Sequence, residues 1–104
     1  MTFIKVASKS EIKEGQMKKV EIQDKEILLV NVKGKIYAIE NKCCHVGGPL
    51  NEGTLENNKI TCPWHRAQYD VTTGEATENS AIPGLQQNKF EVKIEKENVL
   101  VNLG

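Results

Sequence analysis

Two short segments hold every histidine and every cysteine of this chain. The first is Cys43-Cys44-His45, and the second, after sixteen intervening residues, is Cys62-Pro63-Trp64-His65. Thiolate and imidazole groups are the protein ligands that soft and borderline metal ions prefer. Their concentration in two places, with none elsewhere in the sequence, predicts a metal centre built from both segments.

The candidate ligands alternate between cysteine and histidine, in the order Cys43, His45, Cys62 and His65. Each segment can therefore give its thiolate to one metal and its imidazole to another, which suits a centre with two metal positions. A two-iron, two-sulfur centre in which two histidines replace two cysteines on one iron has this donor set. A structural zinc site uses the same ligand types, so it remains the alternative.

The two segments and the stretch that follows them, Gln68-Tyr69-Asp70-Val71-Thr72-Thr73-Gly74-Glu75, resemble the Rieske family, in particular its soluble ferredoxins. The resemblance extends over the whole chain and implies one 2Fe-2S cluster, with Cys43 and Cys62 on a buried iron. By the same resemblance, the two histidines bind an outer iron near the surface. Neutral imidazoles leave the oxidised centre without net charge, so it accepts an electron more easily than a four-cysteine cluster.

Residues around the ligands imply a low-potential member of the family, within the range of roughly −150 to +300 mV that Rieske centres cover. High-potential relatives have a disulfide between the two loops, but the corresponding positions here are Gly48 and Trp64. Ala67 stands where those relatives have a serine, whereas their tyrosine is present as Tyr69. We therefore expect one additional hydrogen bond, from Tyr69 to a ligating sulfur.

The sequence departs from the family pattern at two positions. Arg66 follows the second histidine, where the family usually has a glycine that permits positive φ or close backbone approach. Cys44 lies between the first two ligands and adds a competing thiol. The family spacing, with histidine two residues after cysteine, favours Cys43 as the ligand.

Composition restricts the partners and the compartment. The 104 residues include 14 basic and 14 acidic side chains, so the long-range field that attracts nucleic acids or anionic lipids is absent. The N-terminal residues contain no apolar run of the length of a signal peptide or membrane span, which predicts a cytoplasmic protein without a membrane anchor. Thiols persist in that reducing compartment and remain available to metals.

Short runs with apolar alternation, separated by turn residues, predict an all-β fold, an antiparallel β-sandwich or small barrel. The only helical candidate is one turn at Ser10 to Gly15. The expected strands are Phe3 to Val6, Met17 to Ile22, Ile27 to Val32, Ile36 to Ile39, Lys59 to Thr61, Ala67 to Val71, Phe90 to Glu95 and Val99 to Leu103.

The length fits one domain, residues 1–104. The stretches without strand character are Asn41 to Gly53 and Ser80 to Asn88, and loops on a rigid sheet are where function usually resides. The resemblance implies a Rieske fold in which two loops form a small cluster-binding subdomain, at about residues 41–75. Pro83-Gly84 is expected to form a turn, and a third loop that shields the cluster is the alternative that the resemblance implies there.

The sequence offers no second site for substrate chemistry, because both histidines are used and no glycine-rich nucleotide-binding turn is present. We therefore expect an electron-transfer protein and no enzyme: a one-electron carrier between a reductase and a terminal oxygenase or other oxidoreductase. A zinc-stabilised binding module and a small subunit of a larger reductase, such as nitrite reductase, are the alternatives. The expected docking surface consists of Val46, Pro49, Leu50, Trp64 and Pro83.

Overall fold

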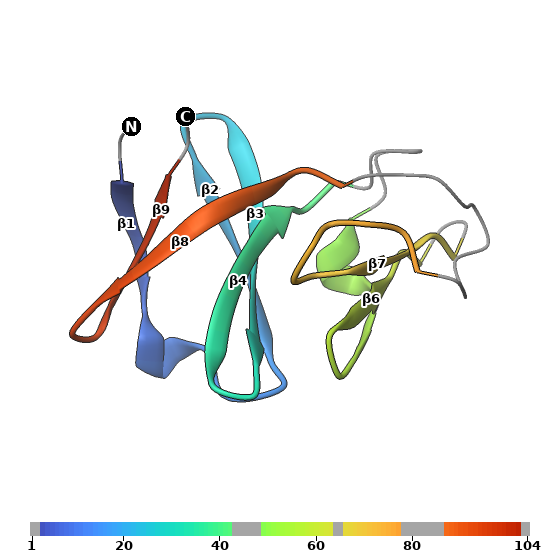
Figure 1. The fold of residues 1–104 in the computed structure, drawn as a ribbon. Coiled ribbons are helices and arrows are strands. Elements are labelled where there is room, and N and C mark those ends of the chain that lie inside the picture. The colour runs from blue at the N-terminus through green and yellow to red at the C-terminus, as the bar shows by residue number, and fades with distance from the viewer. Residues whose placement is uncertain (1–2, 43–48, 64–65, 78–86, 103–104) are drawn as a thin grey trace.

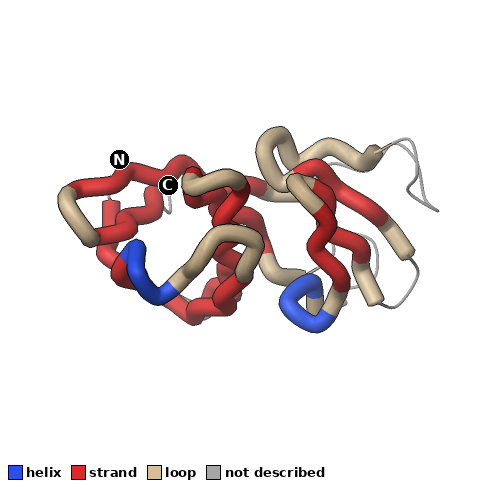
Figure 2. Tube along the Cα trace, turned by 90° about the horizontal axis from the view of Figure 1, so that it is seen from below, coloured by secondary structure: helices blue, strands red, loops and turns tan. Residues whose placement is uncertain are grey.

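The computed structural model describes residues 3–42, 49–63, 66–77 and 87–102, and these form two antiparallel sheets (Figure 1). The larger sheet has the order β1-β9-β8-β4-β3-β2 and curls into a nearly closed barrel, and the smaller has the order β5-β6-β7. Figure 2 shows the two sheets side by side along the longest dimension of the molecule. The strands are β1 (Phe3–Ser8), β2 (Met17–Ile22), β3 (Lys25–Val32), β4 (Lys35–Glu40), β5 (Thr54–Glu56), β6 (Lys59–Thr61), β7 (Gln68–Asp70), β8 (Lys89–Glu95) and β9 (Asn98–Asn102).

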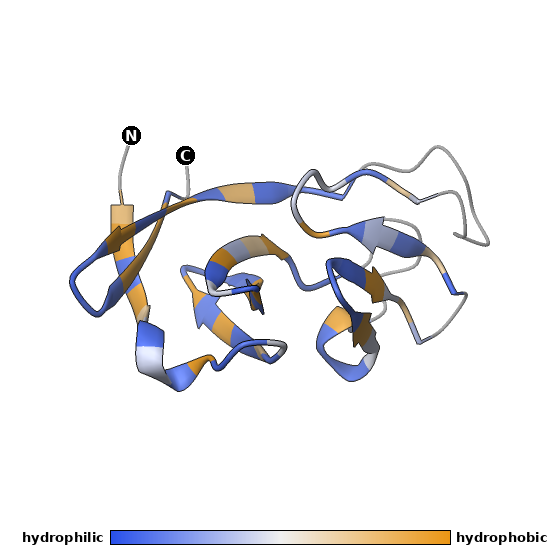
Figure 3. Cartoon of the chain, turned by 60° about the horizontal axis from the view of Figure 1, so that its bottom comes forward, coloured by the Kyte–Doolittle hydropathy of each residue, from blue (hydrophilic) through white to orange (hydrophobic). Residues whose placement is uncertain are grey.

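Tight turns with positive φ connect β2 to β3 and β3 to β4. Gln23 and Asp24 join β2 to β3 with φ values of 51° and 67°, and Lys33 and Gly34 join β3 to β4 with 53° and 89°. Positive φ at both central residues gives a turn whose twist matches that of the flanking strands. Hydrophobic and hydrophilic residues alternate along β8, as expected for a strand with one solvated face (Figure 3).

Strand β3 separates two hydrophobic cores and contributes side chains to both. Ile27 and Leu29 point into the core inside the larger sheet, whereas Leu28 and Val30 point to the opposite face and pack against the smaller sheet. The four residues are fully buried, which explains why the sequence has an unbroken apolar run here. The smaller sheet is therefore packed firmly against the wall of the larger one.

The inter-sheet core is the group of buried residues between the two sheets. It combines residues of β3 and β4 with residues of the smaller sheet and of the 3-10 helix η2 (Leu50–Glu52). Its members are Leu28, Val30, Ile39, Leu50, Ile60, Cys62, Ala67, Tyr69 and Val71. One predicted metal ligand, Cys62, thus belongs to the hydrophobic core that joins the sheets.

The all-β prediction is confirmed, with differences mainly at the ends of strands. β2 and β6 have the predicted bounds, and the other predicted strands differ by one or two residues among the described positions. The expected helical turn is displaced to the 3-10 helix η1 (Lys9–Glu11), and sequence reasoning missed both η2 and β5. No helix in the described ranges is long and apolar enough to cross a membrane.

Candidate metal centre

The predicted second ligand segment lies at the end of a hairpin. Strands β6 and β7 pair from Lys59 with Asp70 to Thr61 with Gln68, and the hairpin continues beyond these pairs. The backbone N–H of Cys62 donates to the Ala67 carbonyl at 2.7 Å, and the Arg66 N–H donates to the Cys62 carbonyl at 3.2 Å. These two bonds fix the backbone of Cys62 on both sides of its side chain.

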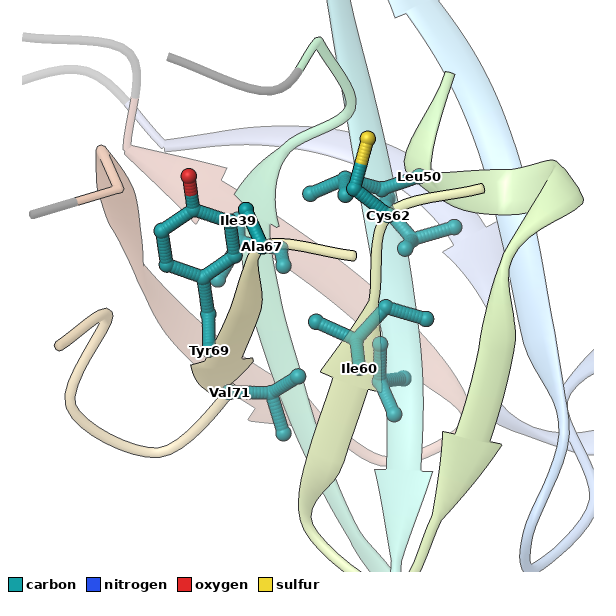
Figure 4. Packing of buried hydrophobic residues seen from close by; sticks show 9 residues of the cluster. Ile39, Leu50, Ile60, Cys62, Ala67, Tyr69 and Val71 are labelled. Atoms are coloured by element: carbon teal, nitrogen blue, oxygen red, sulfur yellow. The ribbon is translucent and has the colours of Figure 1, made fainter. Parts of the chain in front are cut away.

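The Cys62 side chain is completely buried, among apolar residues of the inter-sheet core. Figure 4 shows its Sγ and the hydroxyl of Tyr69 on the same side of that core, while Ile60 and Val71 lie toward the other side. A thiolate in apolar surroundings is unfavourable unless a cation compensates its charge. The position therefore fits a cysteine that binds a buried metal ion, which is the role expected for Cys62.

The first ligand segment is closed at its base by strand-like pairing. Lys42 and Pro49 form an isolated antiparallel bridge, and the Leu50 N–H donates to the Asn41 carbonyl at 2.8 Å. The two chain segments that flank residues 43–48 are therefore hydrogen-bonded to each other. The structure thus supplies a fixed base for the segment that carries the predicted ligands Cys43 and His45.

The chain that follows β7 returns along the same hairpin. Tyr69 and Ala76 form an antiparallel bridge, and the Thr77 N–H donates to the Gln68 carbonyl at 2.9 Å. After residues 78–86, the N–H of Gln87 donates to the Gly74 carbonyl at 2.7 Å. The described ends of all three loops thus lie at one end of the molecule, beside the smaller sheet (Figure 1).

Arg66 has a left-handed backbone conformation, with φ at 58°. This is the position where the family usually has glycine, so the turn keeps the geometry that glycine favours although the residue is arginine. A β-carbon in this region of φ and ψ costs roughly 1–2 kcal/mol. The Arg66 side chain is exposed, so it adds a positive charge at the loop without taking part in the core.

Asp70, at the end of β7, is held in its ionised form by local hydrogen bonds. Burial raises the pKa of this carboxyl, but the Thr72 hydroxyl and N–H, which donate to its Oδ1 at 2.6 and 2.9 Å, oppose that effect. Together with the Asn58 side chain and the charge of Lys59, they bring the pKa below its usual value. The turn after β7 therefore favours the ionised form of this aspartate.

Several predicted site residues lie outside the described residues, so the structure does not test them. These are Cys43, Cys44, His45, Val46, Gly48, Trp64, His65 and the Pro83-Gly84 turn. Of the predicted ligands, the structure places Cys62, and it also places Tyr69 and Ala67 on the same hairpin.

The predicted docking surface is wrong at one residue, Leu50. Leu50 has no exposed surface, because it packs in the inter-sheet core as the first residue of η2. Pro49, directly before it, is partly exposed and remains available for contact. The physical reason is the short helix η2, which begins at Leu50 and turns the chain inward immediately after Pro49.

Sequence reasoning also missed two buried amides at the base of the loops, Asn41 and Gln87. Each has hydrogen bonds to backbone groups of another segment. No motif marks them, because their importance comes from contacts between segments that are far apart in the sequence.

Comparisons with known proteins agree with this geometry. Residues 2–91 match the profile of a family described as "Rieske [2Fe-2S] domain". The ferredoxin component of the naphthalene 1,2-dioxygenase system of Pseudomonas putida is 37% identical over 102 residues, which cover 97% of this chain and 95% of that protein. Human apoptosis-inducing factor 3 is 41% identical over 92 residues, 88% of this chain but only 15% of that much longer protein.

A solved complex of reduced oxygenase and oxidized ferredoxin in carbazole 1,9a-dioxygenase contains a chain with the same fold. It superimposes with a TM-score of 0.87 at 29% identity, covering 95% of this chain and 91% of that one. The comparisons confirm the predicted Rieske fold and the predicted 2Fe-2S cofactor of the domain.

Proposed function

Since the chain belongs to the Rieske [2Fe-2S] domain family, we propose that it is a one-electron carrier between a reductase and a terminal oxygenase or other oxidoreductase, and not itself an enzyme. The observation that carries this proposal is the position of Cys62, buried in the core at the end of the β6–β7 hairpin. A metal centre bound there is attached to the hydrophobic core that joins the two sheets. A rigid ligand set reduces the rearrangement that must accompany a change of charge.

We propose Cys43, His45, Cys62 and His65 as the ligands of the cluster. Residues 1–104 then form one Rieske domain, with the cluster-binding part at about residues 41–75. When bound, the cluster supplies the reversible uptake and release of one electron.

The chain's own residues hold and shield that centre. The hydrogen bonds of Cys62 with Ala67 and Arg66 fix one thiolate, and the apolar side chains around it exclude water. Pairing of Lys42 with Pro49 closes the base of the first ligand segment. Polar backbone and hydroxyl groups near the cluster sulfurs would stabilise the additional negative charge after reduction.

The proposed partners follow from the relatives. The naphthalene relative is a component of a dioxygenase system, and the carbazole structure contains a ferredoxin together with an oxygenase. A terminal oxygenase and a reductase are therefore the partner classes we propose, with Pro49 and the exposed Pro63 in the docking surface. We place this function in the cytoplasm, because thiolate ligands of an iron centre are maintained in a reducing compartment.

A second candidate function has one observation in its favour. The match to a small part of human apoptosis-inducing factor 3 shows that such a domain also occurs within a longer chain. An electron-transfer part of a larger reductase assembly is therefore the runner-up. A zinc-stabilised binding module is disfavoured by the family match.

Metal analysis and a redox titration test the proposal. Purified protein should contain about two iron and two acid-labile sulfide per chain, and a spectroelectrochemical titration should give a single one-electron wave. The absorbance should return through repeated cycles of reduction and oxidation. Stoichiometric zinc without sulfide, or a centre that cannot be reduced reversibly, would contradict the proposal.

A further inference from the structure

The side chain of Gln87 lies at the point where the third loop returns to the larger sheet. It is 1% exposed, and its Nε2 donates to the carbonyl oxygens of Glu40 at 2.7 Å and Lys42 at 2.6 Å. Both acceptors lie in residues 40–42, directly before Cys43. We call these three residues the arm of the first ligand segment. One amide group therefore uses both of its N–H donors on the residues that lead into a predicted ligand.

The residue between the two acceptors is fixed from the opposite side. Asn41 is fully buried, and its Oδ1 accepts from the Asn51 N–H at 2.8 Å while its Nδ2 donates to the Asn51 Oδ1 at 2.8 Å. Its backbone N–H also donates to the Glu26 carbonyl at 2.9 Å. In an extended chain the backbone groups of alternate residues point to opposite edges, so the Glu40 and Lys42 carbonyls face Gln87 while the backbone groups of Asn41 face Glu26 and Leu50.

Gln87 is also attached to the β7 side of the site, because its own N–H donates to the Gly74 carbonyl at 2.7 Å. The neighbouring Asn88 continues the connection to β4, since its carbonyl accepts from the Glu40 N–H at 2.8 Å. Gln87 thus joins the arm of the first ligand segment, the turn after β7 and the end of the third loop. Among the described residues, no buried side-chain nitrogen or oxygen lacks a hydrogen-bond partner.

We propose that Gln87 is a positioning residue for the metal centre: its buried amide holds the arm that carries Cys43 and His45 and couples it to the third loop. The inference rests on the proposed function, because it assumes that the first segment supplies ligands. The Gln87 amide is buried although its two hydrogen bonds are only partly buried, and replacing it by an apolar group removes both contacts that hold the arm. Without the amide, the arm gains freedom to open, which allows water and chelators to reach the ligands.

Three variants of the cluster-loaded full chain test this role. Gln87→Met keeps the size but removes both donors, and Gln87→Asn keeps the amide but shortens its reach by one methylene. The matched control is Asn88→Ala, which removes an exposed hydrogen bond from Asn88 Nδ2 to the Glu40 carboxylate, between the same two segments. Asparagine is polar and smaller than glutamine, so Gln87→Asn should fold. It tests the positioning role if Gln87→Met does not fold.

The measurements are the rate of iron release to a ferrous chelator and the electron paramagnetic resonance spectrum of the reduced protein. We expect roughly tenfold faster release for Gln87→Met, and a smaller increase in the same direction for Gln87→Asn. Both should broaden or shift the reduced spectrum, because the geometry of the ligands becomes less uniform. Asn88→Ala should match the parent in both measurements.

Parent-like release and an unchanged spectrum in the Gln87 variants would overturn the proposal, even if their unfolding temperature fell, because Gln87 would then only pack. An equal effect of Asn88→Ala would overturn it too, since any contact between the segments would then suffice. Failure of the proposed function would be visible elsewhere: the parent itself would contain no iron and sulfide.

Discussion

Arg66 combines an exposed side chain with a backbone conformation that favours glycine, at φ 58°. Arg66→Gly should relieve the strain of the β-carbon, partly offset by the greater freedom of glycine in the unfolded chain. We expect a gain of about 0.5 kcal/mol in the free energy of unfolding, measured by urea titration. Arg66→Ala is the control, because it removes the charge but keeps the β-carbon. If Arg66→Ala gained as much, the charge and not the backbone would be the cause.

Tyr69 is fully buried, and its hydroxyl lies on the same side of the inter-sheet core as the Cys62 Sγ (Figure 4). We expect this hydroxyl to donate to a ligating sulfur, which stabilises the reduced state more than the oxidised one. Tyr69→Phe should therefore lower the reduction potential by several tens of millivolts without loss of the cluster. Ala67→Ser should act in the opposite direction. A Tyr69→Phe protein with the parent potential would mean that the tyrosine only packs.

Chemical type and spacing in the sequence predict candidate ligands, but they do not predict residues that act through contacts between distant segments. Cys62 and Tyr69 carry predicted roles because their spacing follows a family pattern, and their burial in one core agrees with those roles. Gln87 could not, because its partners are more than forty residues away in the sequence and an isolated glutamine carries no signal. Leu50 was misplaced for the related reason that an apolar residue beside a ligand segment fits a surface patch and a core equally well.

At the scale of elements, the β6–β7 hairpin that carries Cys62 depends on close packing against η2. A β-carbon at Gly53, the residue after η2, would collide with the carbonyl oxygen of Thr61, the last residue of β6. Backbone at such close range cannot give way without moving the strand. Glycine at position 53 is therefore needed for space, because its φ of −83° is accessible to other residues.

Gly53→Ala should displace β6 and with it Cys62. We expect a loss of about 1–3 kcal/mol in the free energy of unfolding, as for other overpacked sites, together with faster release of iron. Chemical denaturation and a chelator assay measure the two effects. Glu52→Ala, next to it and exposed, should leave both unchanged. Parent stability in Gly53→Ala would show that η2 and β6 separate easily.

Strands with clear alternation and tight turns could be predicted from the sequence, including β2 and β6 with their bounds. Sequence reasoning missed η2 and β5. Each is three residues long, and both follow closely after the first ligand segment. Such short elements have no periodicity to read. Their stability comes from tertiary packing, here from Leu50 in the inter-sheet core and the pairing of β5 with β6.

At the scale of the whole molecule, acid should weaken the fold through Asp70. Its pKa is lowered in the folded protein, so its ionised form contributes stability above the unfolded value of about 3.9. That contribution is lost as the pH falls through the lower folded value. Asp70→Asn should reduce the free energy of unfolding by roughly 0.5 kcal/mol at pH 7, because Thr72 then donates to a neutral acceptor while solvent screens part of the effect at this partly exposed carboxyl.

The difference in free energy between the parent and Asp70→Asn should shrink as the pH falls below about 4. Effects of acid on the metal centre are common to both proteins and cancel in the comparison. Urea unfolding at several pH values supplies the data. A difference that stays constant down to the acid limit would show that the charge of Asp70 does not contribute.

We propose that the imidazoles of His45 and His65 bind the outer iron of a cluster that carries one electron. Each bound imidazole keeps an N–H whose proton is released more readily when the iron is ferric than when it is ferrous. Between the two deprotonation steps, reduction takes up a proton as well as an electron, so the potential must fall as the pH rises. Protein-film voltammetry from acid to alkaline pH measures this directly. We predict a flat potential on the acid side and a fall in the alkaline range, whereas a potential that stays flat throughout would contradict ligation by His45 and His65.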